Sequence, residues 1–92
     1  MKEESVRIFV EGIVQGVYFR QSLKKKAMKH IVCGWTRNLD DGRVEAVLQG
    51  SKKDVEKVIA WAKQGPPRAR VTGVKEEWDD QSKKFDSFDI IY

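Results

Sequence analysis

Residues 12–20 combine two glycines and an arginine in a spacing that suits the binding of an anion. Gly12 and Gly16 bracket a turn, and glycine permits backbone angles that let several N–H groups point toward one centre. Arg20 follows where a helix is expected to begin, so both the helix dipole and a bidentate guanidinium favour a phosphate there. An ordinary strand–helix connection with a surface arginine has the same spacing, so the spacing alone leaves both interpretations open.

The second candidate segment is residues 34–50, in which Asn38 closes a predicted strand just before a tight turn at residues 40–42. A side-chain amide at this place can contribute to a polar site. It also has an ordinary explanation, because asparagine tolerates left-handed backbone angles and bonds to its own backbone in turns. Taken by itself, Asn38 therefore does not identify a site.

The charge of the chain is concentrated around these two segments. The 92 residues carry a net charge of +4, whereas residues 12–39 hold six lysines and arginines and no acidic residue. The run from Lys24 to Lys26 resembles a patch for nucleic acid or another anionic surface, and its alternative is the solvated face of a helix. In either case the lysines add positive potential close to the glycine loop.

Several kinds of site and location are excluded or disfavoured. Cys33 is the only cysteine, so an intramolecular disulfide and a cysteine-rich zinc site are excluded. His30 is the only histidine, which leaves little for a Ser-His-Asp triad, although a metal held by carboxylates alone stays open. No apolar run approaches the roughly 18–20 residues that span a membrane, and the N-terminus does not resemble a secretory signal. We therefore expect a cytoplasmic protein that is not bound to a membrane.

Five strands and two helices are expected to position these residues. Apolar residues alternate with polar ones in the strands, and they recur every three or four residues in the helices. The first helix shows a stripe of Phe19, Leu23, Ala27 and Ile31, and it ends near His30. The predicted strands cover residues 6–10, 33–38, 44–48, 71–78 and 88–92, and the predicted helices begin at residues 19 and 52.

The second helix has clear signals at both ends. Ser51 with Asp54 three residues later is typical of a helix N-cap, and residues 64–67, Gln-Gly-Pro-Pro, end the helix. Its expected buried face consists of Val55, Val58, Ile59 and Ala62. Residues 79–84 are polar and are expected to form a solvated turn before the short last strand.

The order strand, helix, two strands, helix, strand predicts one α+β domain over residues 1–92. We expect a ferredoxin-like βαββαβ plait, that is, an antiparallel sheet with two helices on one face. This fold supports many activities, so it does not identify the function.

Taken together, the two candidate segments resemble the signatures of the acylphosphatase family. Residues 10–20 match the first signature throughout, including the Val-Gln-Gly-Val core at residues 14–17 and the Phe-Arg ending at Phe19 and Arg20. The second signature is matched at Gly34, Trp35, Arg37, Asn38, Gly42, Val44 and Gly50. Thr36 departs from it, because the family usually has alanine, valine or cysteine there, and threonine is nearly isosteric with valine.

The resemblance implies a metal-free hydrolase that acts on the carboxyl–phosphate anhydride of small acyl phosphates and needs no cofactor. By carry-over, Arg20 and the backbone amides of Gln15, Gly16, Val17, Tyr18 and Phe19 hold the phosphoryl group, and Asn38 orients the attacking water. The expected partners are a small acyl phosphate as substrate and inorganic phosphate as product, with no nucleic acid, no membrane and a monomeric enzyme.

Two other functions share the expected fold. An RNA-binding plait of the RRM type would use the basic segment, but it needs stacking aromatics on a central strand, and residues 44–50 contain none. A non-catalytic module related to acylphosphatase would not need both Arg20 and Asn38, and this chain has both. The sequence therefore favours the enzyme.

Overall fold

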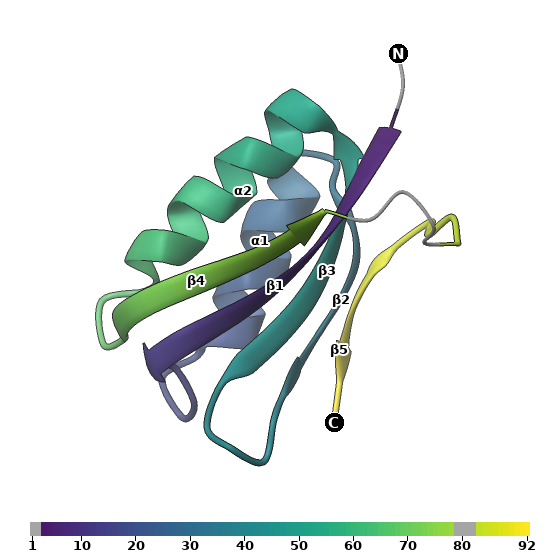
Figure 1. The fold of residues 1–92 in the computed structure, drawn as a ribbon. Coiled ribbons are helices and arrows are strands. Elements are labelled where there is room, and N and C mark those ends of the chain that lie inside the picture. Colours follow the sequence, from purple (N-terminus) through teal and green to yellow (C-terminus); the bar gives the residue numbers. More distant parts are fainter. Residues whose placement is uncertain (1–2, 79–82) are drawn as a thin grey trace.

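The computed structural model describes residues 3–78 and 83–92, in which five strands and two helices follow the predicted order (Figure 1). The elements are β1 (Glu3–Ile13), α1 (Phe19–Lys29), β2 (Cys33–Asn38), β3 (Val44–Ser51), α2 (Lys52–Gln64), β4 (Arg70–Trp78) and β5 (Phe88–Ile91). Most of the turn predicted at residues 79–84 lies outside the described residues.

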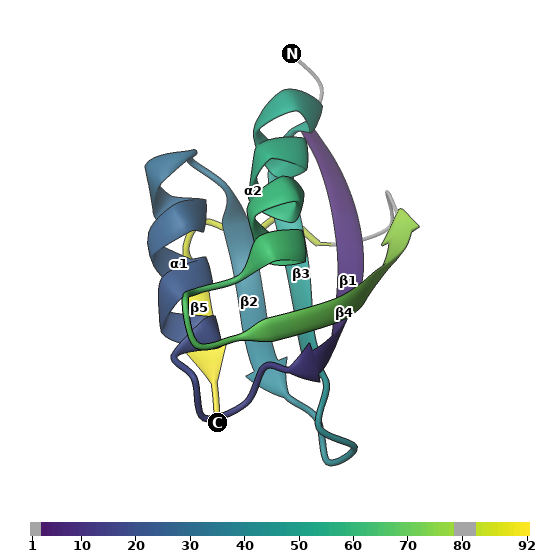
Figure 2. The same ribbon diagram turned by 90° about the vertical axis from the view of Figure 1, so that its left-hand side faces the viewer.

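The strands form one sheet in the order β4-β1-β3-β2-β5, and both helices cover the same face of it (Figures 1 and 2). β1 pairs antiparallel with β3 and β4, and β2 pairs antiparallel with β3, as predicted for a ferredoxin-like plait. This arrangement brings the C-terminal end of β2 and the N-terminal end of α1 to the same end of the molecule as the C-terminal end of β5 (Figure 2).

The prediction of a wholly antiparallel sheet is wrong at one edge, because β5 pairs parallel with β2. After β4 the chain crosses from one edge of the sheet to the other, and β5 then runs in the same direction as β2. Parallel neighbours require a long connection, and the segment between β2 and β5 contains two strands and a helix. The sheet is therefore mixed.

The core lies between the helices and the covered face of the sheet. Alternate residues of β1 and β3 are fully buried there, and they meet the apolar stripes of α1 and α2. The members of this core in those elements are Val6, Ile8, Val10, Val44, Ala46, Leu48, Phe19, Leu23, Ala27, Val55, Val58, Ile59 and Ala62. All four predicted core positions of α2 are buried, and Ser51 caps this helix as predicted, its hydroxyl accepting from the backbone N–H of Asp54.

The prediction that Ile31 extends the buried stripe of α1 is wrong. The helix ends at Lys29, and Ile31 is 81% exposed with a left-handed φ of 57°. The N–H of Ile31 donates to Met28 O and that of Val32 donates to Ala27 O, which are the two hydrogen bonds of a Schellman C-cap. The chain reverses at Ile31, so Val32 takes the buried position instead.

No helix in residues 3–78 or 83–92 is both long enough and apolar enough to cross a membrane.

Candidate active site

The glycine loop between β1 and α1 depends on unusual backbone angles. A β-bulge separates Glu11 from Gly12, whose φ is 121°, and a Cβ on Gly12 would lie 2.0 Å from the carbonyl oxygen of Arg70. Gly16 has a φ of 75°, and Tyr18, the N-cap of α1, also lies in the left-handed region with a φ of 63°. With these left-handed backbone angles, residues 14–18 bend around the beginning of α1.

The backbone donors of this loop are free within the described part of the chain. The N–H groups of residues 15–19 donate to no acceptor there, and Tyr18 supplies no side-chain cap to α1. The first turn of α1 also has no acidic residue, so its positive dipole end is not neutralised locally. Such a set of free N–H groups at a helix N-terminus favours an anion.

Arg20 borders two neighbouring cavities. The first, of about 380 Å³, lies against the glycine loop and is lined by Val14, Gly16, Tyr18, Phe19, Arg20, Gln21 and Arg68. The second, of about 470 Å³, shares Arg20 with the first and is lined by Arg20, Arg37, Asn38, Asp40, Ile91 and Tyr92. The structure thus brings Arg20 and Asn38 together from elements that are separate in the sequence.

Asn38 is the last residue of β2 and carries an unusual acceptor. Its Oδ1 atom is buried and accepts no hydrogen bond from the described residues. A buried polar atom without a partner costs about 1–3 kcal/mol, so its presence at a cavity wall needs a reason. A hydrogen-bonded ligand or water in the cavity would supply one.

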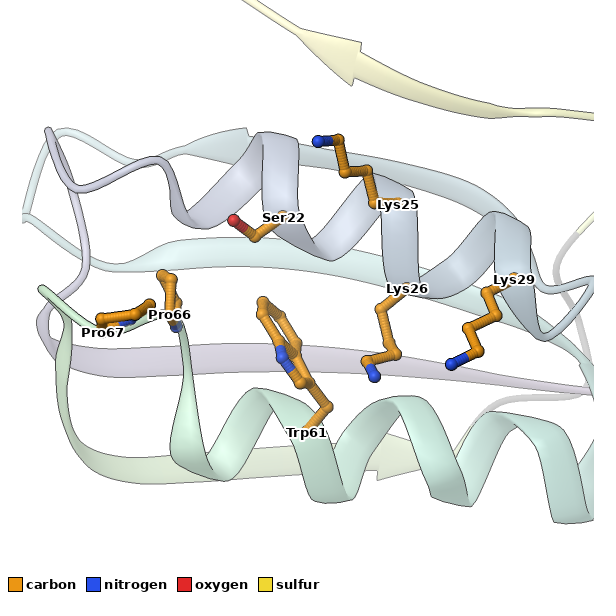
Figure 3. A pocket seen from close by; sticks show the side chains of 7 residues that line it. All are labelled: Ser22, Lys25, Lys26, Lys29, Trp61, Pro66 and Pro67. Carbon is orange, nitrogen blue, oxygen red and sulfur yellow. The ribbon is translucent and has the colours of Figure 1, made fainter.

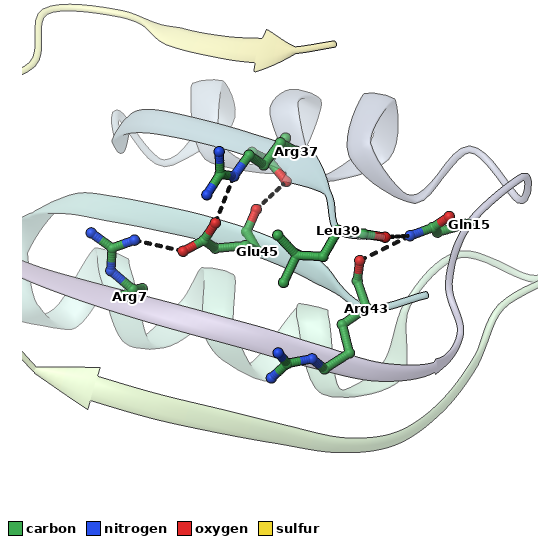
Figure 4. Close-up of polar contacts among 7 residues, drawn as sticks. Arg7, Gln15, Arg37, Leu39, Arg43 and Glu45 are labelled. Carbon is green, nitrogen blue, oxygen red and sulfur yellow. Dashed lines mark hydrogen bonds and ion pairs between the residues drawn. The ribbon is translucent and has the colours of Figure 1, made fainter. Parts of the chain in front are cut away.

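Gln15 and Val17 contribute differently from the other predicted residues. The side-chain amide of Gln15 donates to the carbonyl oxygens of Leu39 at 2.8 Å and Arg43 at 3.0 Å (Figure 4). The side chain of Val17 packs against the core. Neither side chain lines the two cavities, so only the backbone N–H of each is available to an anion.

Seven residues that line the cavities had not been predicted as site residues: Val14, Gln21, Arg37, Asp40, Arg68, Ile91 and Tyr92. The guanidinium of Arg20 lies 5.1 Å from the centroid of the Tyr92 ring, a distance typical of a cation–π contact. Ile91 and Tyr92 reach the site only because β5 pairs with β2, which no local sequence pattern indicates. Arg37 belonged to the basic segment and to the second signature, next to Asn38, but neither pattern marked it as a site residue.

A charged cluster on the uncovered face of the sheet holds Arg37. The Glu45 carboxylate accepts hydrogen bonds from Arg7 and from Arg37 Nε, the latter at 2.7 Å (Figure 4). Burial by itself raises the pKa of Glu45, but the hydrogen bonds and charges of Arg37 and Arg7 outweigh it, so the pKa lies below its ordinary value. Glu45 is therefore a carboxylate at neutral pH that fixes two arginines.

The lysines of α1 do not form one patch. Lys25, Lys26 and Lys29 border a groove of about 270 Å³ between α1 and α2, together with Ser22, Trp61, Pro66 and Pro67 (Figure 3). Lys24 lines a different depression near β5. None of the four lysines forms an ion pair within the described residues, which fits a solvated helix face better than a single anionic surface site.

No group of three or more histidine, cysteine, aspartate or glutamate side chains converges on a metal-sized site anywhere in residues 3–78 and 83–92.

Comparisons with known proteins agree on one family. The sequence profile described as "Acylphosphatase" matches residues 6–90. An acylphosphatase of Pyrobaculum islandicum is 48% identical over 92 residues, which are 99% of this chain and 97% of that protein. One from Pyrobaculum calidifontis is 54% identical over 85 residues, which are 91% of this chain and 77% of that protein.

The solved structures give the same result. The crystal structure of acylphosphatase from Bacillus subtilis superposes with a TM-score of 0.93 at 34% identity, over 97% of this chain and 99% of that one. The acylphosphatase structure from Coxiella burnetii gives a TM-score of 0.92 at 35% identity, over 97% and 93%. Sequence and fold therefore lead to the same conclusion: the chain belongs to the acylphosphatase family, enzymes that hydrolyse acyl phosphates to a carboxylate and inorganic phosphate.

Proposed function

We propose that this chain hydrolyses acyl phosphates by direct attack of one water molecule on phosphorus, and that its own backbone and two side chains suffice for the reaction. Arg20 and the N–H groups of residues 15–19 hold the phosphoryl group, and Asn38 orients the water. The observation that carries this division is the position of Arg20, which borders both the cavity at the glycine loop and the cavity that contains Asn38.

The chemistry needs few groups. The water oxygen forms a bond to phosphorus as the bond from phosphorus to the acyl oxygen breaks, and the carboxylate leaves with the electron pair. The conjugate acid of this leaving group has a pKa of about 4–5, like a glutamic or aspartic acid, so the carboxylate needs no proton from a general acid. The water's protons pass to phosphate and solvent. Positioning and charge stabilisation are the main tasks that remain.

The metal-free character is tested with acetyl phosphate as the substrate and EDTA present. We expect turnover to be unaffected by the chelator and to be inhibited competitively by inorganic phosphate, since phosphate occupies the same amide loop as the substrate. If chelation abolished turnover and Mg²⁺ restored it, this part of the proposal would be wrong.

The roles of the two side chains are tested by comparing two variants. Arg20→Gln should weaken inhibition by phosphate as well as lower kcat, because it removes a charged partner of the phosphoryl group. Asn38→Ala should lower kcat by a factor on the order of 10² with little change in phosphate inhibition, because it affects the water. Lys24→Gln, which removes a positive charge outside both cavities, is the control. Loss of phosphate inhibition in Asn38→Ala, with kcat retained, would contradict these roles.

We also propose that the enzyme acts as a monomer. The groups that the proposed reaction uses, the loop N–H groups, Arg20 and Asn38, are all supplied by one copy, so the proposed reaction requires no second one. Sedimentation equilibrium at assay concentrations should give the mass of one chain, and activity that rose with self-association would contradict this.

A further inference from the structure

We propose that the groove between α1 and α2 binds a nucleoside diphosphate, with the base against Trp61 and the phosphates at Lys26 and Lys29 (Figure 3). None of the residues that line this groove lines either cavity of the candidate active site. The inference therefore concerns a second site, and it does not depend on the proposed hydrolysis.

Two of the lysines of α1 turn their amino groups into the groove. Lys26 and Lys29 are three residues apart, so they lie on the same face of the helix, and Figure 3 shows both Nζ atoms directed toward α2. In the same view the Nζ atom of Lys25 points away from α2, and Lys24 lies outside the groove. The groove therefore contains two amino groups about one helical turn apart, and the other two lysines of this helix take no part.

The charges of these two lysines have no acidic partner. Lys26 is half-buried, and neither Lys26 nor Lys29 forms an ion pair within residues 3–78 and 83–92. The residues that line the groove include no aspartate or glutamate. Both lysines lie in the last turn of α1, where the helix dipole stabilises a positive charge. Two free ammonium groups side by side are complementary to an anion that carries more than one negative charge.

The rest of the groove suits a flat aromatic ring. Figure 3 shows the indole of Trp61 rising from α2 between Pro66 and the amino group of Lys26. The Phe19 ring packs against this indole with the ring centroids 5.5 Å apart, so the indole is held in place before a ligand binds. Trp61 is only half-buried, and its exposed part faces the groove. Any nucleobase can stack on such a surface, because every base has a π-face.

The dimensions of the groove favour a single nucleotide. Its volume of about 270 Å³ is close to the lower limit of about 300 Å³ for small-molecule sites, which corresponds to one small ligand. Ser22, Lys26 and Lys29 follow one another along the groove and span about 10 Å of the helix axis. An extended nucleoside diphosphate has a similar length, with the ring at one end and the charge at the other. The groove shows the same order, with Trp61 first and the two lysines beyond it (Figure 3).

The experiment is an NMR titration of the ¹⁵N-labelled protein with ADP, with inorganic phosphate in excess so that the glycine loop is occupied. ADP should shift the indole N–H signal of Trp61 until it saturates and leave those of Trp35 and Trp78 unchanged. Pyrophosphate, which has the charge without the base, should bind about ten-fold more weakly than ADP, because it cannot stack on the indole. Lys26→Gln should raise the dissociation constant of ADP about five-fold at constant ionic strength. Lys24→Gln, an equal charge change outside the groove, should change it by less than about two-fold.

Each other outcome overturns the inference. A titration that leaves the Trp61 signal in place would show that the groove does not bind ADP, and shifts confined to residues 15–19 would place ADP at the glycine loop. Equal affinities for ADP and pyrophosphate would show that the indole does not recognise the base. Equal weakening in Lys26→Gln and Lys24→Gln would assign the binding to the overall charge of the protein. Failure of acetyl phosphate hydrolysis, with ADP still bound at Trp61, would contradict only the proposed function.

Discussion

At the scale of single residues, Gln15 connects the two halves of the site. Its side-chain amide donates to two carbonyl oxygens of the β2–β3 hairpin, and its backbone N–H belongs to the glycine loop. The hairpin follows Asn38, so this side chain links the amide proposed to orient the water to the loop proposed to hold the phosphate. We therefore expect the Gln15 side chain to position Asn38 relative to the loop.

Removal of the Gln15 side chain should affect turnover more than phosphate binding. In Gln15→Ala two carbonyl oxygens lose a partner, which costs about 1–2 kcal/mol of the free energy of unfolding. Asn38 is then less well placed, so we expect kcat to fall several-fold while inhibition by phosphate changes by less, because the loop N–H groups remain. Gln64→Ala, at the exposed end of α2, is the control. Equal losses of kcat and of phosphate affinity would argue against a positioning role.

The residue scale also shows how far sequence reasoning reaches. Arg20 and the loop were predicted to lie together because they are adjacent in the chain. Asn38 was added by the resemblance of its surrounding motif to a family signature. The side-chain contacts of Gln15 were not predicted, because its partners lie 24 and 28 residues away and are backbone carbonyls, which any residue type supplies.

At the scale of the elements, the end of α1 shows a conflict between residue type and backbone. Ile31 occupies the C′ position of a Schellman cap, where glycine is the usual residue. A β-branched residue with positive φ is strained, and the side chain of Ile31 is 81% exposed, so little burial compensates for this strain. The structure thus contains a position at which one substitution should increase stability.

Ile31→Gly should raise the free energy of unfolding by about 1 kcal/mol, because the relief of strain exceeds the entropy that glycine adds to the unfolded chain. Urea unfolding at neutral pH measures the change. Ile13→Gly is the matched control, since Ile13 is also an exposed isoleucine but lies in β1, and there glycine should be destabilising. A lower stability of Ile31→Gly would show that the exposed side chain contributes more than its backbone strain costs.

Gly34 in β2 is required for the approach of two strands. Its φ is 137°, and a Cβ there would lie 1.9 Å from the carbonyl oxygen of Val47 in β3. Gly34→Ala should therefore destabilise the protein by more than about 2 kcal/mol and displace the strand that carries Asn38. Gly50→Ala is the control, because its nearest neighbour would be at 3.4 Å and its φ is not positive. Similar stability of the two variants in urea would contradict this account.

Element boundaries and types were predicted well where the pattern is local, and less well where it is not. The period-two alternation around Phe88 predicted a strand, but the same alternation fits either direction of pairing, so the parallel register with β2 could not be predicted. The four-residue stripe of α1 continued in the sequence to Ile31, but the C-cap ends the helix earlier. The alternation around Phe88 does not indicate the direction in which the strand pairs, and the stripe of α1 does not indicate the residue at which the helix ends.

At the scale of the whole molecule, the positive charge is divided among separate places. Of the six bases in residues 12–39, Arg20 and Arg37 line the cavity that contains Asn38, and the four lysines lie along α1. The positive charge is therefore distributed over separate surfaces, and it does not form one continuous basic patch across the sheet. Glu45 neutralises part of the excess next to the site, and Asp40 lines the same cavity, so the protonation of Glu45 affects both the charge beside the site and the stability of the sheet.

Glu45 should make the stability of the whole molecule depend on pH at the acid limit. Its folded pKa lies below its ordinary value near 4.5, so the folded state binds the proton less readily than the unfolded chain does. The stabilisation is complete above about pH 4.5 and is lost as the pH falls through the folded pKa. In Glu45→Gln this dependence disappears. The variant should be roughly 1–3 kcal/mol less stable at pH 7, where Arg7 and Arg37 lose their carboxylate, and should approach the unmodified protein at pH values below the folded pKa of Glu45. Arg7→Gln, which removes one of the two donors, should move the loss of stability to higher pH. Urea unfolding from pH 7 to pH 3 measures all three proteins, and a constant difference between Glu45→Gln and the unmodified protein across this range would show that the ion pairs with Glu45 do not control the acid limit.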